Sequence, residues 1–328
     1  MTTSPARRPV FLDCDTGIDD ALALALLLAS PEIELVGIGS VSGNTSAERG
    51  AINTLDLLAL AGRTDIPVAL GAHDPLSHPF NGGVPHIHGH NGIGDVQIPD
   101  SGREVAPVDA AQLLIDLAHE HGGALELITI GPVTNIAHAL RRDPALAGLI
   151  REVTLMGGAA MVPGNVTPLA EANIWNDPEA FAVMLEAEWD LVLVPLDVTM
   201  ENVFTEEDRQ ALLASPSPFA QALGNILDLY FNFYVSVYGH RSCALHDPLA
   251  VALAVGTVTA TRAPAVDMVV DTTDGPGRGQ TICDLRAQRL GTVDTPGVRT
   301  RVVLDTDVPL APILLQRILD FSNALPRD

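Results

Sequence analysis

Lysine is absent from this 328-residue chain, in which all 18 basic residues are arginine. The absence excludes Schiff-base chemistry, a phosphate-binding P-loop lysine and a lysine general base. Aromatic residues are also few, at 4% of the chain. The 41 acidic residues outnumber the basic ones, and the formal net charge of −23 makes nucleic acid and anionic membrane surfaces poor partners.

Cysteine is scarce, and the three cysteines form no Cys-x-x-Cys pair; they are Cys14, Cys243 and Cys283. Their odd number and wide spacing argue against a disulfide framework and suit a reducing compartment. No apolar run is long enough to span a membrane, and residues 1–9 lack the apolar core of a signal peptide. These absences together predict a cytoplasmic protein.

Strand-like and helix-like apolar runs alternate along almost the whole chain, and an apolar content of 47% is enough for a large core. The strand-like runs are 10–12, 33–41, 125–130, 153–156, 191–195, 266–270 and 299–304. The helical patterns are 18–29, 47–61, 108–121, 133–141, 178–187, 248–255 and 311–324. This alternation predicts an α/β fold with a mainly parallel central sheet flanked by helices. We expect a short flexible tail at residues 1–8 and a single domain at residues 9–328.

Two longer irregular stretches interrupt the alternation, at residues 71–107 and 157–176. Loops of this length in a compact domain are usually functional or disordered. Both stretches are rich in glycine, histidine and asparagine, so we expect them to form part of a site.

Four carboxylates fall within eight residues, where a short apolar run gives way to a long helical one: Asp13, Asp15, Asp19 and Asp20. The pattern is typical of a strand, a tight turn at Gly17 and a helix, and ligands bind beyond the carboxyl ends of parallel strands. Like charges this close repel unless a cation or shared protons offset them, and a hard divalent cation fits carboxylate ligands. Helix capping could explain one or two of these residues, but not four.

Further along the chain, the Asp-Pro pairs at residues 143–144, 177–178 and 247–248 have the form of ordinary helix starts. Of these three pairs, only Asp247-Pro248 follows a histidine, His246. Taken alone, Asp247 is better explained as an ordinary helix start than as a functional residue.

The second irregular stretch contains two amides and a carboxylate, which are Asn165, Glu171 and Asn173. Such side chains can hold sugar hydroxyls, which need both donors and acceptors. From these residues alone, however, hydrogen bonding to the loop backbone explains them better. In the first stretch, His86, His88 and His90 alternate among glycines. A mobile flap that contributes a histidine on closing explains them better than a transition-metal site.

In chain order, these motifs resemble the nucleoside hydrolases, the inosine-uridine-preferring family of ribonucleoside N-ribohydrolases. The resemblance rests on ordered blocks that span most of the chain: Asp13 to Asp20, Val41 to Asn44, Ile130 to Ile136, Met156 to Gly158, Asn165 to Asn173 with Asp177 to Ala180, and His246 to Pro248. It implies hydrolysis of the N-glycosidic bond of ribonucleosides to base and ribose. Inosine and uridine, or pyrimidine nucleosides, are the favoured substrates, and the enzyme is expected to be a homodimer or homotetramer.

The resemblance also implies roles for individual residues. The Ca²⁺ cofactor is expected to bind the side chains of Asp15, Asp20 and Asp247 and the backbone carbonyl of Ile130. Asp15 is also expected to act as general base on a metal-bound water. The residues expected to hold the substrate are Asp19, Asn44, His88, Asn165, Glu171 and Asn173.

At the leaving base, the resemblance places His246 as the candidate proton donor, with Tyr234, Tyr238 and Arg241 as weaker candidates. Two departures from the family pattern bear on base preference and not on the reaction. The flap at residues 88–92 lacks the acidic residues that many relatives carry, and Ala172 replaces an aromatic residue found in some members.

Two other functions remain open from the residues alone. A haloacid-dehalogenase-like phosphatase also places Asp-x-Asp after its first strand, but it usually employs a lysine, and its motif differs at Gly17. A non-catalytic, Ca²⁺-dependent protein that binds nucleosides or sugars could use the same scaffold.

Overall fold

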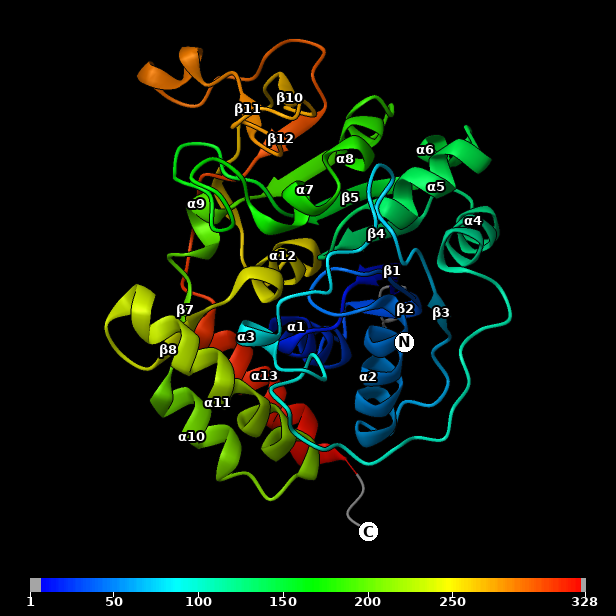
Figure 1. Ribbon diagram of the computed structural model, residues 1–328, viewed down its shortest axis with the longest axis vertical. Coiled ribbons are helices and arrows are strands. Elements are labelled where there is room, and N and C mark those ends of the chain that lie inside the picture. Colours follow the sequence, from blue (N-terminus) through cyan, green and yellow to red (C-terminus); the bar gives the residue numbers. More distant parts are fainter. Residues whose placement is uncertain (1–6, 326–328) are drawn as a thin grey trace, which may run out of the picture.

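The computed structural model describes residues 7–325, and its central element is a seven-stranded sheet (Figure 1). The strand order is β12-β6-β5-β4-β1-β2-β3, and every neighbouring pair is parallel. The strands are β1 (Arg8–Cys14), β2 (Ile33–Ser40), β3 (Val68–Leu70), β4 (Leu125–Thr129), β5 (Ile150–Met156), β6 (Leu191–Val194) and β12 (Thr300–Val302). The predicted α/β fold with a parallel central sheet is therefore confirmed.

Helices cover both faces of the sheet, because successive strand residues point to opposite sides. In β1, Val10 and Leu12 join one hydrophobic core and Phe11 joins the other. The first core lies under α1 (Ile18–Leu28), α2 (Ala47–Leu60) and α12 (His246–Val255). The second core lies under α4 (Ala110–His121), α5 (Thr134–Arg142) and α8 (Pro178–Leu185).

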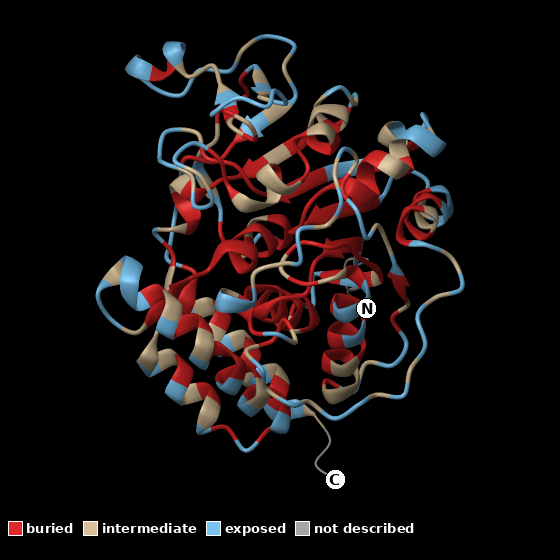
Figure 2. Cartoon of the chain, in the orientation of Figure 1, coloured by how far each residue is buried: buried red, intermediate tan, exposed pale blue. Residues whose placement is uncertain are grey.

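A further layer of helices covers α1, all of whose residues are buried (Figure 2). This layer consists of α10 (Glu206–Leu213), α11 (Pro218–Tyr238) and α13 (Ala311–Ala324). The long helix α11 was not among the expected helices. Its buried residues recur every three or four positions, as they do in an amphipathic helix, so the sequence did contain the signal.

Short elements complete the fold. The short helices are α3 (Pro85–His88), α6 (Leu146–Leu149), α7 (Ala172–Asn176), α9 (Leu196–Thr199) and η1 (Arg286–Leu290). The short strands outside the central sheet are β7 (Val203–Thr205), β8 (Ser242–Ala244), β9 (Ala260–Arg262), β10 (Met268–Val270), β11 (Thr281–Cys283) and β13 (Asp305–Thr306). The strand-like run at 266–270 thus contributes β10, which pairs with β11 in a separate antiparallel hairpin.

The beginning of the chain differs in part from the tail expected at residues 1–8. Residues 1–6 of that tail lie outside the described residues. Arg8 is the first residue of β1, and its guanidinium donates to Glu126 at 2.8 Å and to the Ala254 carbonyl at 3.1 Å. Arg8 is therefore part of the sheet.

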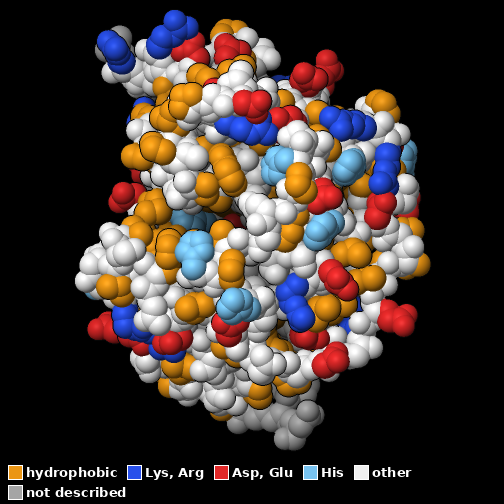
Figure 3. All heavy atoms as spheres, in the orientation of Figure 1, with side chains coloured by type: hydrophobic (Ala, Val, Ile, Leu, Met, Phe, Trp, Pro, Cys, Tyr) orange, Lys and Arg blue, Asp and Glu red, His pale blue; other side chains and the backbone are white. Residues whose placement is uncertain are grey.

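Many arginine side chains are paired with carboxylates on the surface. In Figure 3, blue arginine side chains are scattered, several of them beside red carboxylates. Examples of such pairs are Arg278 with Glu179, at 2.8 Å, and Arg142 with Asp109, at 2.7 Å. Within the described part of the chain, no helix combines the length and apolarity needed to cross a bilayer.

Candidate active site

The turn between β1 and α1 contains the first part of the site. Asp20, in the first turn of α1, accepts hydrogen bonds from the backbone N–H groups of Gly17 at 2.8 Å and Asp15 at 3.2 Å. Gly17 must be small here, because a Cβ would collide with the His88 ring and the Asn44 side chain. The capping role considered for these aspartates therefore falls to Asp20, and it leaves the other carboxylates free for other roles.

Carboxylates from distant parts of the chain meet beside this turn. Oxygen atoms of Asp19, Asp20 and Asp247 lie within 4.8 Å of one another, and all three residues are buried. Asp247 belongs to the first turn of α12, which packs against α1 and so brings it to the end of β1. The structure thus joins the N-terminal aspartate cluster to Asp247, as the resemblance implied.

Burial makes this cluster electrostatically costly. Desolvation, followed by the neighbouring carboxylate of Asp20, raises the pKa of Asp19 to about 7 and that of Asp15 well above its usual value. Desolvation and the nearby carboxylates also raise the pKa of Asp247 well above its usual value. Charged, unneutralised carboxylates are disfavoured in such a place.

The donor atoms present fit a hard divalent cation. Two buried carboxylate oxygens, Oδ1 of Asp15 and Oδ1 of Asp19, have no hydrogen-bond partner. Buried polar atoms are almost always satisfied, so two orphaned oxygens beside an acidic triad indicate a missing positive partner. All available ligand atoms are oxygens, which is the donor set that Ca²⁺ and Mg²⁺ prefer.

A cavity of about 310 Å³ opens onto these carboxylates. The residues expected from the sequence that line it are Asp19, Asn44, His88, Ile130, Asn165, Glu171, Asn173, His246 and Asp247. Asp15 and Asp20 lie behind this wall, where Asn44 donates its backbone N–H to Asp15 Oδ2 at 2.6 Å and its side-chain amide to Asp20 Oδ2 at 3.1 Å. The residues expected to bind the cation or the substrate, together with His246, are thus in the cavity wall or directly behind it.

One side of the cavity is formed by the loop after β5. Glu171 is buried and accepts hydrogen bonds from the N–H groups of Gly158 at 2.9 Å, Asn173 at 2.9 Å and Ile174 at 3.2 Å. Burial nevertheless raises its pKa to about 6. The Asn173 amide donates to the carbonyl of Ile130 at 3.0 Å, so a candidate sugar ligand and a candidate cation ligand are in direct contact.

His88 occupies the cavity in a different way from the closing flap that was expected. It ends the short helix α3, is only 4% exposed, and its Nδ1 accepts the backbone N–H of Ile18 at 3.0 Å. Because that N–H can only donate, the neutral ring carries its proton on Nε2. His88 is therefore already part of the wall, whereas His86 and His90 are exposed.

The opposite end of the cavity is apolar and aromatic, and it is formed mainly by α3 and α11. Its residues include Val84, Ile87, Met200, Phe233, Tyr234 and Val237. His246 lies here with both ring nitrogens engaged, Nδ1 with the Thr199 hydroxyl at 2.7 Å and Nε2 with the Tyr234 hydroxyl at 2.6 Å. Burial lowers the pKa of His246 to about 4, so the ring is neutral at pH 7.

The three weaker candidates for the proton donor differ in their position relative to the cavity. Tyr234 lines the cavity, but the Tyr238 hydroxyl is bonded to the carbonyl of Met200 at 2.8 Å. Arg241 forms ion pairs with Glu206 at 2.9 Å and with Asp228 at 2.7 Å, outside the cavity wall. Tyr234 is therefore the candidate that lies in position.

Tyr230 is a site residue that sequence reasoning missed. Its hydroxyl donates to Asp19 Oδ2 at 3.0 Å, and its ring packs against those of His88 and Tyr234. It was missed because α11 was missed, although its position four residues before Tyr234 puts both on one helix face.

Comparison with known proteins agrees with this geometry. Residues 10–311 match the family model described as inosine-uridine preferring nucleoside hydrolase. The chain belongs to this nucleoside hydrolase family. The resemblance inferred from the motifs is confirmed, and the protein is an N-glycosyl hydrolase of ribonucleosides.

Individual members of the nucleoside hydrolase family align over much of the chain. A probable uridine nucleosidase 2 of Arabidopsis thaliana is 32% identical over 319 residues, which cover 96% of this chain and 97% of the relative. A pyrimidine-specific ribonucleoside hydrolase RihA of Photobacterium profundum is 36% identical and covers 75% of this chain and 79% of its own. A solved purine-preferring ribonucleoside hydrolase from Gardnerella vaginalis superposes with a TM-score of 0.88 at 34% identity, covering 97% of this chain and 100% of that structure.

The burial of His88 predicts acid sensitivity of the fold. Desolvation, with the nearby histidines, lowers its pKa from 6.5 to about 3, so below pH 6.5 the unfolded chain binds a proton that the folded chain does not. The stability that this ring contributes is present above pH 6.5 and is lost as the pH falls. We expect the free energy of unfolding to fall by about 2 kcal/mol from this residue between pH 7 and pH 5.

Urea unfolding at both pH values would measure this change, with His88→Gln as the matched variant. Glutamine can still accept a hydrogen bond from the Ile18 N–H but does not titrate. The free energy of unfolding of this variant should therefore change by about 2 kcal/mol less between pH 7 and pH 5 than that of the unaltered protein. An equal pH dependence in both proteins would show that His88 is not the group responsible.

Proposed function

We propose that this nucleoside hydrolase cleaves ribonucleosides with Asp15 as general base and Ca²⁺ as cofactor, and that it favours inosine and uridine or pyrimidine nucleosides. The observation that carries the proposal is the meeting of Asp19, Asp20 and Asp247 within 4.8 Å at one end of a cavity. The other end of the cavity is apolar and suits a planar base. The names of the uridine and pyrimidine relatives support the base preference.

The cation would be held by the side chains of Asp15, Asp20 and Asp247 and by the carbonyl of Ile130, with Asp19 in the same cluster. When bound, Ca²⁺ would orient a water and the vicinal ribose hydroxyls and lower the pKa of that water. The flexible coordination of six to eight oxygens that Ca²⁺ accepts leaves room for substrate hydroxyls, which is why we favour it over Mg²⁺.

Asp15 is suited to receive the proton of the attacking water. Its Oδ2 accepts the backbone N–H of Asn44 at 2.6 Å, which fixes the orientation of the carboxylate. Its Oδ1 has no hydrogen-bond partner, so this oxygen would face both the cation and the water that the cation orients. A base with one oxygen anchored and the other free meets the geometric requirement of general-base catalysis.

The ribose would lie among the carboxylates and amides at the same end of the cavity. Asp19 and Glu171 can accept hydrogen bonds from sugar hydroxyls, while Asn44, Asn165 and Asn173 can both donate and accept. Cleavage of an N-glycosidic bond passes through an oxocarbenium-like state, and anionic surroundings stabilise its positive charge. The same acidic residues therefore serve binding and transition-state stabilisation.

The leaving base would lie against Tyr234 and His246. Because His246 is neutral at pH 7 and its Nε2 faces the Tyr234 hydroxyl, we infer that the two act as one donor unit. The Tyr234 hydroxyl, which lines the cavity, would give its proton to the departing base. The Nε2–H of neutral His246 would stabilise the tyrosinate left behind, which would regain a proton from solvent after the base leaves. Proton donation of this kind typically contributes about 10²–10⁴-fold to the rate.

A panel of nucleosides tests the proposed activity. We expect release of free ribose, measured as reducing sugar, from uridine and inosine, with uridine and cytidine turned over faster than adenosine and guanosine. Faster turnover of the purines would overturn the base preference while leaving the reaction intact.

The same panel addresses the two alternative functions. Hydrolysis of a generic phosphate ester would favour a phosphatase, and tight nucleoside binding without ribose release would favour a binding protein. Neither alternative gains support from the family match or from the relatives.

Location and assembly remain predictions. The three cysteines are free, as a reducing cytoplasm would keep them. Size-exclusion chromatography with light scattering would distinguish the homodimer from the homotetramer that we expect.

A further inference from the structure

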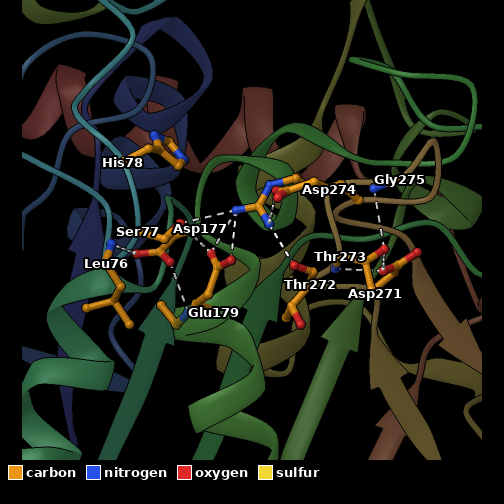
Figure 4. Close-up of polar contacts among 12 residues, drawn as sticks. Leu76, Ser77, His78, Asp177, Glu179, Asp271, Thr272, Thr273, Asp274 and Gly275 are labelled. Atoms are coloured by element: carbon orange, nitrogen blue, oxygen red, sulfur yellow. Dashed lines mark hydrogen bonds and ion pairs between the residues drawn. The ribbon is translucent and has the colours of Figure 1, made fainter.

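The β10–β11 hairpin lies outside the cavity, yet one of its residues contacts two other segments at once. Arg278, in the connection between the two strands, places Nη2 2.8 Å from Glu179 Oε1 and 3.2 Å from Ser77 Oγ. Its Nη1 donates to the carbonyl of Thr272 at 2.9 Å, and the Ser77 hydroxyl donates to Glu179 Oε2 at 2.9 Å. Figure 4 shows Ser77, Glu179 and Thr272 turned toward one point. This point lies between the loop after β3, helix α8 and the hairpin connection.

Residues 76–84, which follow β3, are also tied to the α7–α8 segment on either side of this contact. The backbone N–H of Leu76 donates to the buried carboxylate of Asp177 at 2.9 Å. Further along, the Asn81 amide donates to the Asn176 side chain at 3.2 Å. The contact at Ser77 is therefore the middle one of three between this loop and the α7–α8 segment.

The far end of the same loop enters the cavity wall. Val84 donates its N–H to the carbonyl of Asn44 at 3.0 Å and lines the cavity. The helix α3 follows directly and ends at His88. A movement of residues 77–84 would therefore displace residues on both the sugar side and the base side of the cavity.

The hairpin also supports the opposite wall, the loop at residues 157–176. Thr281 Oγ1 accepts the N–H of Ala159 at 2.9 Å and donates to its carbonyl at 2.7 Å. Gly279 packs so closely on α7 that a Cβ would lie 2.8 Å from the Cα of Trp175. The hairpin thus contacts the loop that carries Glu171 and Asn173, and through Arg278 it contacts the loop that leads to Val84.

We propose that Arg278 is a positioning residue, which holds residues 76–84 against α8 and so keeps the two cavity walls at the separation at which a nucleoside binds. The side chains of Arg278 and Glu179 are 21% and 28% exposed, so the contact is partly shielded from solvent. Burial alone would raise the pKa of Glu179, but hydrogen bonds from Arg278 and Ser77 hold it below its usual value. The proposal takes its substrate from the proposed function.

The expected effect is on substrate binding and not on the chemical step, because Arg278 forms no hydrogen bond or ion pair with a cavity-lining residue among those described. A partly exposed ion pair shifts a conformational equilibrium by about fivefold at most. If the loop position seen here is the binding-competent one, the apparent affinity follows the population of that position and falls by at most this factor. For Arg278→Ala we therefore expect KM for uridine to rise about two- to fivefold, with kcat within about twofold of the unaltered enzyme.

Arg286→Ala is the matched control. Arg286 lies just beyond the same hairpin, is 91% exposed, and among the described residues pairs only with the neighbouring Asp284, at 2.6 Å. Its removal deletes an arginine–carboxylate pair of similar geometry that touches neither loop, and KM should not change. Arg278→Lys keeps the charge but not the fork of two nitrogens, and it should recover part of the lost affinity.

Two further measurements make the test specific. Amide hydrogen exchange without substrate should become faster at residues 77–84 in Arg278→Ala and stay unchanged there in Arg286→Ala. The double variant Arg278→Ala with Glu179→Gln should raise KM no further than either single change, since both break the same contact. Glu179→Gln and Ser77→Ala give the same test through smaller changes, should Arg278→Ala fail to fold.

The proposal is overturned if KM of Arg278→Ala stays within twofold of the unaltered enzyme, or if exchange at residues 77–84 does not change. A lower melting temperature with unaltered KM would also overturn it, because that result describes a purely structural residue. If the unaltered enzyme releases no ribose, the proposed function fails, while the exchange experiment still decides whether Arg278 holds the loop.

Discussion

Asp15→Ala is expected to abolish turnover, with a loss in kcat of at least about 10⁴-fold. Removing a general base alone costs up to about 10⁴-fold, and Asp15 is also expected to hold the cation. Its carboxylate has one oxygen anchored by the Asn44 N–H and one without a hydrogen-bond partner, an orientation that alanine cannot reproduce. Ribose release measures the loss of activity, and elemental analysis of the purified protein measures the expected loss of bound Ca²⁺.

Two further variants separate the roles of Asp15. Asp15→Asn keeps the size of the side chain and an acceptor for the Asn44 N–H but removes the charge, so it should retain the fold and lose the activity. Asp65→Asn is the control, because Asp65 is exposed and pairs only with Arg63 at 2.8 Å. Turnover of Asp15→Ala at the unaltered rate would remove Asp15 as base and as ligand.

His246→Ala is expected to lower kcat by about 10²–10⁴-fold, the usual contribution of positioned proton donation, because Tyr234 loses the ring that supports its hydroxyl as donor. The ring lies at the base end of the cavity and contacts Tyr234 and Thr199, so KM should change little. Steady-state kinetics with uridine and inosine would measure both parameters. If only KM rises, His246 binds the base and takes no part in proton transfer.

Tyr234→Phe tests the pairing of these two residues. It removes the hydroxyl that lies 2.6 Å from His246 Nε2 and leaves the aromatic wall in place. If the two act as one unit, this variant and the double variant should lose about as much kcat as His246→Ala alone. Losses that multiply in the double variant would show that the two residues act independently.

Local sequence patterns were sufficient for the central architecture and for the first cluster of the site. The junction between β1 and α1 places Asp15, Asp19 and Asp20 within one turn, so their proximity follows from the chain itself. Alternating apolar runs likewise predicted six of the seven strands of the central sheet; β3, with three residues, is too short to give a clear pattern. Such information is local and can be read from a few consecutive residues.

Other parts of the site depend on packing between distant segments. From the residues alone, Asp247 was an ordinary helix start, and only the packing of α12 against α1 brings it to Asp19 and Asp20. The buried position of His88 depends on the space left by Gly17, which lies 71 positions away by sequence number. Tyr230 differs from both, because its helical pattern was readable and was overlooked.

The two ends of the cavity come from different layers of the molecule. The acidic end of the cavity is formed at the carboxyl ends of the central strands. The apolar end is formed by α3 and by α11, which lies in the outer helical layer. Substitutions on the inward face of α11 can therefore change which base fits without moving the groups that break the bond. Selectivity and reactivity are thus separable in this architecture, and redesign of one need not sacrifice the other.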